Sequence, residues 1–151
     1  MAGVTIRADS AEVQSALAGM RSRLGDLSPV MQQVAGVLAD EAEQAFEDQR
    51  DPSTLTPWEK LAGSTIATRT EARTWPGRIL QVTGQLASSV SQDHGADFAV
   101  AGSNLVYAAI HQLGGAAGRG GKSLIPARPF LGLSPDGEEE ILDLIGSYLE
   151  P

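Results

Sequence analysis

The sequence predicts a single α+β domain, in which long N-terminal helices pack on a small antiparallel sheet and an amphipathic helix follows at the C-terminal end. Three observations support this fold class. Apolar residues recur at helical spacing in the first third of the chain, two short strand-like runs flank a His-Gly pair, and a further apolar stripe of helical period comes last. At 151 residues the chain has the size of one domain, so residues 1–151 are assigned to one unit with one core.

Two helices are expected in the first third of the chain. Asp9, followed three residues later by Glu12, resembles a capping box, and apolar residues then recur at helical spacing as far as Gly25. Ser28 followed by Pro29 is a favourable start for a second, longer helix, which is expected to end by residue 51. The apolar face of this second helix comprises Val30, Val34, Val37, Leu38, Ala42, Ala45 and Phe46.

The other face of the second helix is acidic. It carries Asp40, Glu41, Glu43, Glu47 and Asp48. The simplest interpretation is a stripe that faces solvent, and the alternative is a surface that lines a charged channel or meets a partner.

A loop and a β-hairpin are expected in the middle of the chain. Residues 52–77 are rich in Ser and Thr, with apolar residues only at isolated positions, and predict a loop with at most one short helix. Ile79 and Leu80 are expected to pack beside Leu86. The strand-like runs 88–91 and 98–101, on either side of His94-Gly95, predict a β-hairpin.

The hairpin is followed by a short helix and a glycine-rich segment. Ser103 or Asn104 is expected to cap a helix that carries Tyr107 and stops at Gly114. Residues 114–123 contain so much glycine that we expect them to lack one fixed shape until a partner binds.

Residues 125–134, Ile-Pro-Ala-Arg-Pro-Phe-Leu-Gly-Leu-Ser, predict a docking segment. Pro126 and Pro129 exclude a helix and disfavour a central strand, which places the segment on a surface. Arg128 and Phe130 would then be presented together, and a guanidinium beside large apolar groups is typical of protein interfaces.

The last segment predicts a terminal amphipathic helix. Ser134 is a favourable N-cap, and Pro135 suits the first helical position. Its apolar stripe comprises Ile141, Leu142, Leu144, Ile145, Tyr148 and Leu149. The acidic run 138–140 could hold a metal or a basic partner, but acids in a first helical turn are stabilised by the exposed amides there, and we adopt that interpretation.

Composition restricts the function. The absence of cysteine excludes disulfides and thiolate chemistry, and no apolar run is long enough to span a membrane, so a soluble protein made in the cytosol is expected. The net charge is −8, although residues 60–128 contain seven basic residues against three acidic ones, a balance of +4. A globally acidic chain gains little from contact with phosphates, which argues against nucleic-acid binding as a primary role.

Candidate catalytic motifs are weak. Gly121-Lys122-Ser123 resembles the end of a phosphate-binding loop. However, the glycine that this motif requires five positions before Gly121 is Ala116 here, and residues 124–126, which end in a proline, cannot begin the helix that would hold the phosphate. Neither His94 nor His111 has a second metal ligand at a familiar spacing. The sequence therefore predicts a protein that is not an enzyme and needs no cofactor or metal.

The order of several motifs resembles the phage virion morphogenesis family, the tail completion proteins of tailed temperate phages. The resemblance extends over most of the chain and is carried by residues 46–52, Trp58, Leu61, Thr65, residues 79–80, 83–86 and 102–103, and the two segments 107–114 and 125–134. The most specific of these are Tyr-Ala-x-x-His-Gln-x-Gly, at residues 107–114, and Pro-Ala-Arg-Pro-Phe-Leu-Gly, at residues 126–132.

The resemblance implies a structural virion protein that forms a homo-oligomeric ring of six copies at the head-proximal end of the tail, or neck, and joins the tail to the head. Implied partners are neighbouring tail and head-connector proteins, with genomic DNA passing through unbound and no membrane contact. The implied location is the virion, and the host cytoplasm during assembly. The residues expected at its interfaces are Tyr107, His111, Gln112, Arg119, Lys122, Arg128, Pro129, Phe130 and Leu131.

Three alternatives remain open from the sequence. The first is a related virion role, either a tail terminator or a head-side connector. The second is a small nucleotide-binding enzyme that uses Lys122 and Ser123. The third is a cytoplasmic adaptor whose terminal helix docks in the groove of a partner.

Overall fold

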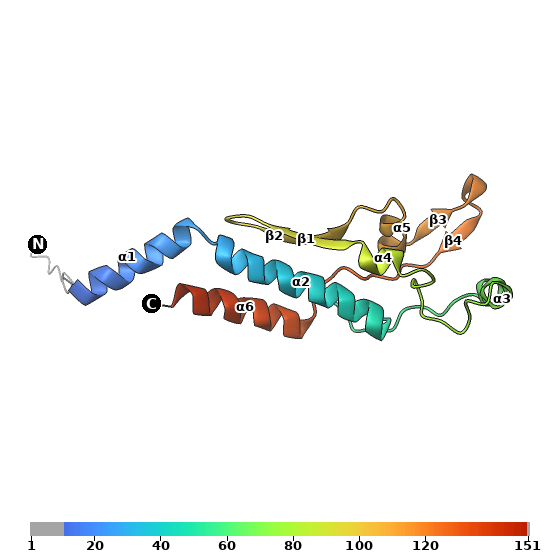
Figure 1. Cartoon of the computed structure of the whole chain (residues 1–151), viewed down its shortest axis with the longest axis horizontal. Helices are drawn as coiled ribbons and strands as arrows, with labels where there is room; N and C mark the ends of the chain where they lie inside the picture. Colours follow the sequence, from blue (N-terminus) through green and yellow to red (C-terminus); the bar gives the residue numbers. More distant parts are fainter. Residues whose placement is uncertain (1–10, 151) are drawn as a thin grey trace, which may run out of the picture.

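The computed structural model describes residues 11–150 and has an elongated shape with helices along most of its length (Figure 1). In chain order its elements are α1 (Ala11–Gly25), α2 (Ser28–Asp48), α3 (Gly63–Glu71), α4 (Gln85–Ser88), β1 (Val90–His94), β2 (Ala99–Ser103), α5 (Ala108–Leu113), β3 (Gly115–Ala117), the short 3₁₀ helix η1 (Arg119–Gly121), β4 (Ser123–Ile125) and α6 (Pro135–Leu149). This is the α+β class that the sequence predicts.

The central element is α2, which lies between a β-hairpin and α6 (Figure 1). The hairpin is antiparallel, with β1 and β2 paired from Val90 opposite Ser103 to His94 opposite Ala99. Pro29 occupies the first turn of α2, and the helix ends at Gln49 in a left-handed conformation. Because β1, β2 and α6 cover different sides of α2, small residues such as Ala42 are completely buried.

The core lies near the C-terminal end of α2, where distant parts of the chain meet. The ring of Phe46 is 5.1 Å from that of Phe130 and 5.7 Å from that of Trp58, measured between centroids. Leu86 packs against the same cluster, with Ile79 and Leu80 at its edge, as expected. Burial of large apolar side chains of this kind stabilises a domain by about 1.5–3 kcal/mol each.

The first helix, α1, differs from the rest because it buries none of its residues. It contacts α6 and projects beyond the body of the molecule (Figure 1). Leu17 and Leu24, on its predicted apolar face, are 60% and 61% exposed. The proposed capping residue Asp9 lies outside the described residues.

Several expected boundaries shift. The segment 85–88 forms α4, so β1 begins later than predicted, at Val90. The prediction that Ser103 or Asn104 caps the short helix is wrong: α5 begins at Ala108 with Tyr107 at the N-cap position, and the hydroxyl of Ser103 is hydrogen-bonded to Ser89 Oγ and to the amide of Leu105. In residues 52–77, the expected single short helix is α3.

The prediction for the glycine-rich segment is wrong. Residues 115–117 and 123–125 pair as the antiparallel strands β3 and β4, with Gly115 opposite Ile125 and Ala117 opposite Ser123. The glycines are needed in the connection, where Gly118, Gly120 and Gly121 have φ between 67° and 78°. The segment therefore forms a projecting hairpin within the single chain. No helix among residues 11–150 is long and apolar enough to cross a membrane.

Candidate assembly interface

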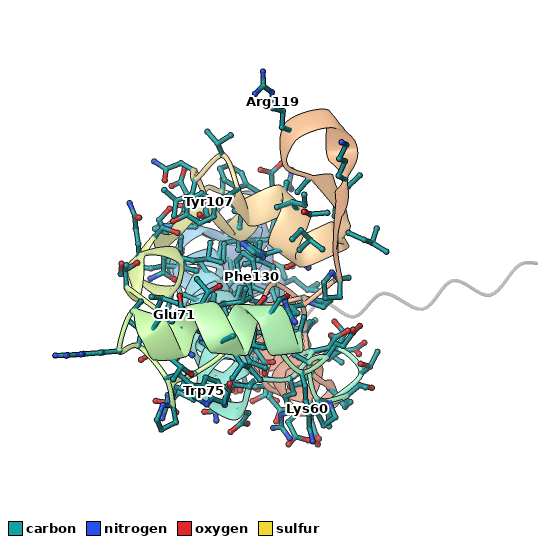
Figure 2. The ribbon with its side chains drawn as sticks, turned by 90° about the vertical axis from the view of Figure 1, so that its right-hand side faces the viewer. Lys60, Glu71, Trp75, Tyr107, Arg119 and Phe130 are labelled. Carbon is teal, nitrogen blue, oxygen red and sulfur yellow. The ribbon has the colours of Figure 1, made fainter. Side chains whose placement is uncertain are left out.

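The predicted docking segment is mostly internal, which corrects the expectation that it lies on a surface. Phe130 has no exposed surface, and Arg128 is only 6% exposed. Pro129 and Leu131 are half-buried. Figure 2 shows Phe130 inside the body of the molecule, whereas Arg119 projects from it. A side chain without accessible surface holds the subunit together and cannot touch a neighbour directly.

The side chain of Gln112 holds this segment against α5. Its Oε1 atom accepts hydrogen bonds from the amides of Phe130 and Leu131, both at 3.0 Å. Its Nε2 atom donates to the Leu131 carbonyl at 2.8 Å. One side-chain amide thus provides hydrogen-bond partners for three backbone groups that are not paired with a strand. Gln112 therefore acts within the subunit.

Trp58 and Arg128 fasten the same segment to the loop before α3. The indole Nε1 of Trp58 donates to the Pro129 carbonyl at 2.7 Å. Arg128 Nε donates to the Glu59 carbonyl at 2.9 Å, and its Nη2 donates to the Lys60 carbonyl at 3.2 Å. Burial lowers the pKa of Arg128, the neighbouring carboxylate of Glu59 opposes this change, and Arg69 adds to it.

Tyr107 and His111 lie one turn apart at α5, with their rings 6.0 Å apart in an edge-to-face arrangement. Tyr107 is 40% exposed, and its hydroxyl donates to Gln85 Oε1. His111 is half-buried, and its Nδ1 atom is buried without a hydrogen-bond partner. Burial lowers the pKa of His111, and the positive charge of Arg128 lowers it further.

His111 and Arg128 both line a cavity of about 320 Å³ between the loop before α3 and the strand β4. Lys60 and Arg69 contribute two further cationic groups to its wall, and Leu124 contributes apolar surface. The sequence did not predict this site, because its residues come from four separate segments. The structure brings together Tyr107, His111, Gln112 and the segment 128–131, and leaves Arg119 and Lys122 apart at the exposed end of the β3–β4 hairpin.

Large exposed apolar side chains lie in both halves of the molecule. Val13, Leu17 and Leu24 form the first set, here named the α1 patch. The second set, named the hairpin-end patch, comprises Val106, Leu113 and Leu124, which are 98%, 77% and 82% exposed. The α1 patch lies on the helix at one end of the long axis, whereas the hairpin-end patch lies on α5, the loop before it and β4, in the other half of the molecule (Figure 1). The helical spacing predicts the first set as the apolar face of an amphipathic helix, and none of the three residues of the second set is among the predicted interface residues.

The acidic face of α2 is only partly a solvated stripe. Glu41 is half-buried: its Oε2 accepts from the amide of Ser134 at 3.1 Å, and its Oε1 from the hydroxyl of Ser134 at 2.6 Å. Asp48 forms an ion pair with Arg50. Asp40, Glu43 and Glu47 are exposed, as predicted.

Two candidate chemistries have no geometric support within residues 11–150. The residues after Lys122 form the strand β4, whereas a phosphate-binding loop requires a helix there. No group of three or more His, Cys, Asp or Glu side chains in the described part of the chain could hold a metal ion.

An elongated α+β subunit with large apolar side chains exposed on separate elements has surfaces of the kind that assembly proteins use for contact with other subunits. Sequence comparison defines the family. The chain belongs to the phage virion morphogenesis family, whose profile matches residues 8–150.

The relatives are proteins of Mu-like phages. Protein G of Escherichia phage Mu, named as a candidate capsid assembly protein, is 44% identical over 113 residues, which cover 74% of this chain and 72% of the relative. The Mu-like prophage FluMu G protein 2 of Haemophilus influenzae is 36% identical over 139 residues, which cover 92% of this chain and 90% of the relative. The chain is therefore a phage virion morphogenesis protein. No solved structure matches it.

Proposed function

We propose that the protein is a structural component of the virion that forms a ring of six copies at the head-proximal end of the tail, completes the tail and joins it to the head. In this role it is not an enzyme and needs no cofactor. The observation that carries the proposal is the presence of two different apolar patches in opposite halves of an elongated subunit. Its family membership supports a role in virion assembly.

Two different patches favour head-to-tail contact between copies. When one patch of a subunit meets the other patch of its neighbour, the interface is heterologous, and repetition closes a ring if the rotation between copies allows it. The α1 patch and the hairpin-end patch together expose six large apolar side chains, and apolar surface of this kind is typical of protein–protein contact sites. Burying them between copies would supply the association free energy.

The charge of the chain suits a channel for DNA. With a net charge of −8 and exposed acids on α2 and α6, a ring of copies would carry a large negative charge. Negative walls repel phosphates at short range, so genomic DNA could pass without specific binding. Neighbouring tail and head-connector proteins would contact the two open faces of the ring.

Native mass spectrometry of the purified chain over a range of concentrations tests the ring. The wild type is expected to form closed six-subunit complexes that do not change with magnesium and ATP. Leu17→Asp and Leu124→Asp should each prevent closure, whereas Val100→Asp, which changes an exposed residue of neither patch, should not. A wild type that stays monomeric and binds ATP would contradict the proposal.

Electron microscopy of phage particles that lack the protein tests its position. If the protein completes the tail, the deletion should leave filled heads beside unjoined tails of normal length, and added purified protein should join them. Tails of excessive length would instead indicate a tail terminator. Protein that remains attached to isolated heads would indicate a head-side connector.

A further inference from the structure

The cavity beside α3 concentrates positive charge inside a chain that is acidic overall. Its wall includes Lys60, Arg69, His111 and Arg128, and Glu59 is the only one of its described lining residues with a carboxylate. The cavity volume of about 320 Å³ exceeds that of one carboxylate group and would accommodate an acidic side chain with part of its backbone. One of its lining residues, Leu124, also belongs to the hairpin-end patch, whereas its cationic residues belong to neither apolar patch.

Arg128 is the buried charge of this site. It is 6% exposed, and its side chain donates hydrogen bonds to the neutral backbone carbonyls of Glu59 and Lys60. Within residues 11–150 the one recorded ion pair joins Arg50 and Asp48, so Arg128 has no carboxylate in contact. The neighbouring carboxylate of Glu59 favours the charged form of Arg128 without forming an ion pair with it. A buried guanidinium that lacks a direct ion pair is costly, and a carboxylate that entered the cavity would reduce that cost.

A second group in the cavity also lacks a partner. The Nδ1 atom of His111 is buried and makes no hydrogen bond, which is uncommon for a buried polar atom. Lys60, by contrast, is exposed at the edge of the cavity, where it could meet an approaching acid. Leu124, 82% exposed, adds an apolar side chain to the same rim.

We propose that this cavity binds the carboxylates on the outer face of α6 from a second copy of the chain. The inference rests on the proposed ring and specifies one of its contacts. The acids of that face are Asp136, Glu139, Glu140 and Asp143, all exposed and spaced to share one side of the helix. No residue of α6 is basic, so the helix itself supplies no counter-charge.

The chemistry of the rim favours a protein segment over a free anion. Leu142 is 63% exposed and flanks the acids of α6, as Leu124 flanks the cations of the cavity. A free anion would gain nothing from this apolar rim. In the same chain α6 packs along α2 and α1, away from α3 and β4, so its acids cannot reach the cavity of their own subunit (Figure 1).

The experiment is a charge exchange between the two surfaces, measured by sedimentation velocity and native mass spectrometry on full-length protein. The cavity variant carries Lys60→Glu and Arg69→Glu, and the helix variant carries Glu139→Lys and Glu140→Lys. Matched controls with the same charge changes, at exposed residues outside both surfaces, are Arg73→Glu with Arg78→Glu and Glu43→Lys with Glu47→Lys. Thermal unfolding of each variant confirms that it folds.

Each exchanged variant alone would place like charges in contact and should weaken association about tenfold or more. An equimolar mixture of the two should assemble again. The acidic cavity of the first variant then meets the basic helix of the second, and the basic cavity of the second meets the acidic helix of the first. Such rings must alternate the two variants, so they can close only with an even number of copies. The controls should assemble as the wild type does.

The outcomes separate this inference from the ring itself. If both exchanged variants still form closed rings, the proposed function stands and the inference is overturned. If the wild type forms only open dimers, and association is lost in each exchanged variant and recovered in their mixture, the inference is supported and the ring is contradicted. A wild type that stays monomeric at all concentrations would overturn both. If acetate or phosphate raises the melting temperature of the wild type but not of the cavity variant, while assembly is unchanged, the site binds free anions only and the inference fails.

Discussion

At the scale of single residues, polar side chains hold the internal segment 128–131 in place. Trp58, Gln112 and Arg128 direct their hydrogen bonds to backbone groups rather than to one another. The segment follows Pro126, contains Pro129 and has no strand partner, so its amides and carbonyls depend on these side chains. The same residues that indicate an interface in the sequence thus serve the interior of the subunit.

Gln112→Ala is expected to lower the free energy of unfolding by about 2–4 kcal/mol, because three backbone groups would lose their partner. Urea unfolding followed by circular dichroism measures this change. Gln44→Ala, at an exposed position of α2, is the control and should change stability by less than about 0.5 kcal/mol. Equal effects of the two substitutions would show that the Gln112 contacts contribute nothing specific.

His111 should make stability fall in acid. Burial and Arg128 lower its pKa below the ordinary value of 6.5, so the unfolded chain binds this proton at a higher pH than the folded one. The stabilisation is therefore complete above pH 6.5 and is lost as the pH falls below it. Unfolding free energies of the wild type and His111→Leu, measured from pH 8 to pH 5, should show a steeper decline for the wild type. Parallel pH profiles would contradict this assignment.

At the scale of elements, two local contacts decide how the parts of the chain are joined. Gly114 ends α5 with φ 71° and ψ 176°, and a Cβ there would lie 2.7 Å from the amide nitrogen of Ala127. Glu41 joins α2 to the start of α6 through Ser134, whose hydroxyl also accepts from the amide of Gly137. Both contacts join residues that are not neighbours in the sequence, Gly114 with Ala127 and Glu41 with Ser134.

Gly114→Ala should destabilise the protein by about 1–3 kcal/mol, because the left-handed φ and the close backbone both disfavour a side chain. The matched control is Gly146→Ala in α6, where a Cβ would meet nothing within 4 Å. That control should be neutral or stabilise by up to about 1 kcal/mol. Thermal unfolding distinguishes the two, and similar melting temperatures would contradict the close approach at Gly114.

Glu41→Ala should weaken the attachment of α6 by about 1–3 kcal/mol, because the amide and hydroxyl of Ser134 lose a charged acceptor. Amide hydrogen exchange should show faster exchange at the start of α6. Glu43→Ala, at an exposed position of the same helix, is the control. Unchanged exchange in α6 would show that α2 holds it by apolar contacts alone.

At the scale of the whole molecule, charge and apolar surface are unevenly distributed along the long axis. The cations of residues 60–128 gather mainly at the end with α3 and the β3–β4 hairpin, whereas Asp93 and Asp97 belong to the β1–β2 hairpin. Figure 1 shows α1 at the opposite end. A subunit with two unlike ends is suited to head-to-tail assembly.

A chain that begins at Asp26 should fold normally and fail to form rings. Because α1 buries none of its residues, its removal should change the unfolding free energy of the remaining body by less than about 1 kcal/mol. Chemical denaturation measures the first effect, and native mass spectrometry measures the second. Rings formed by the shortened chain would exclude the α1 patch from the interface.

The sequence by itself determined the fold class, the presence of α2 with Pro29 in its first turn, the N-cap of α6 and the membership of the family, because helical period, caps and motif order are local properties. The N-cap of α2 is Leu27 rather than Ser28, and the helix ends at Asp48, before the predicted residue 51. The burial of Phe130 and Arg128, the cationic cavity and the exposure of α1 were decided only by the tertiary structure. An Arg-Pro-Phe segment has the same composition inside a fold as on its surface, and whether an apolar stripe is covered depends on which distant element packs against it. The partners of Gln112 and Glu41 lie 18–19 and 93 positions away in the chain, beyond the reach of any local pattern.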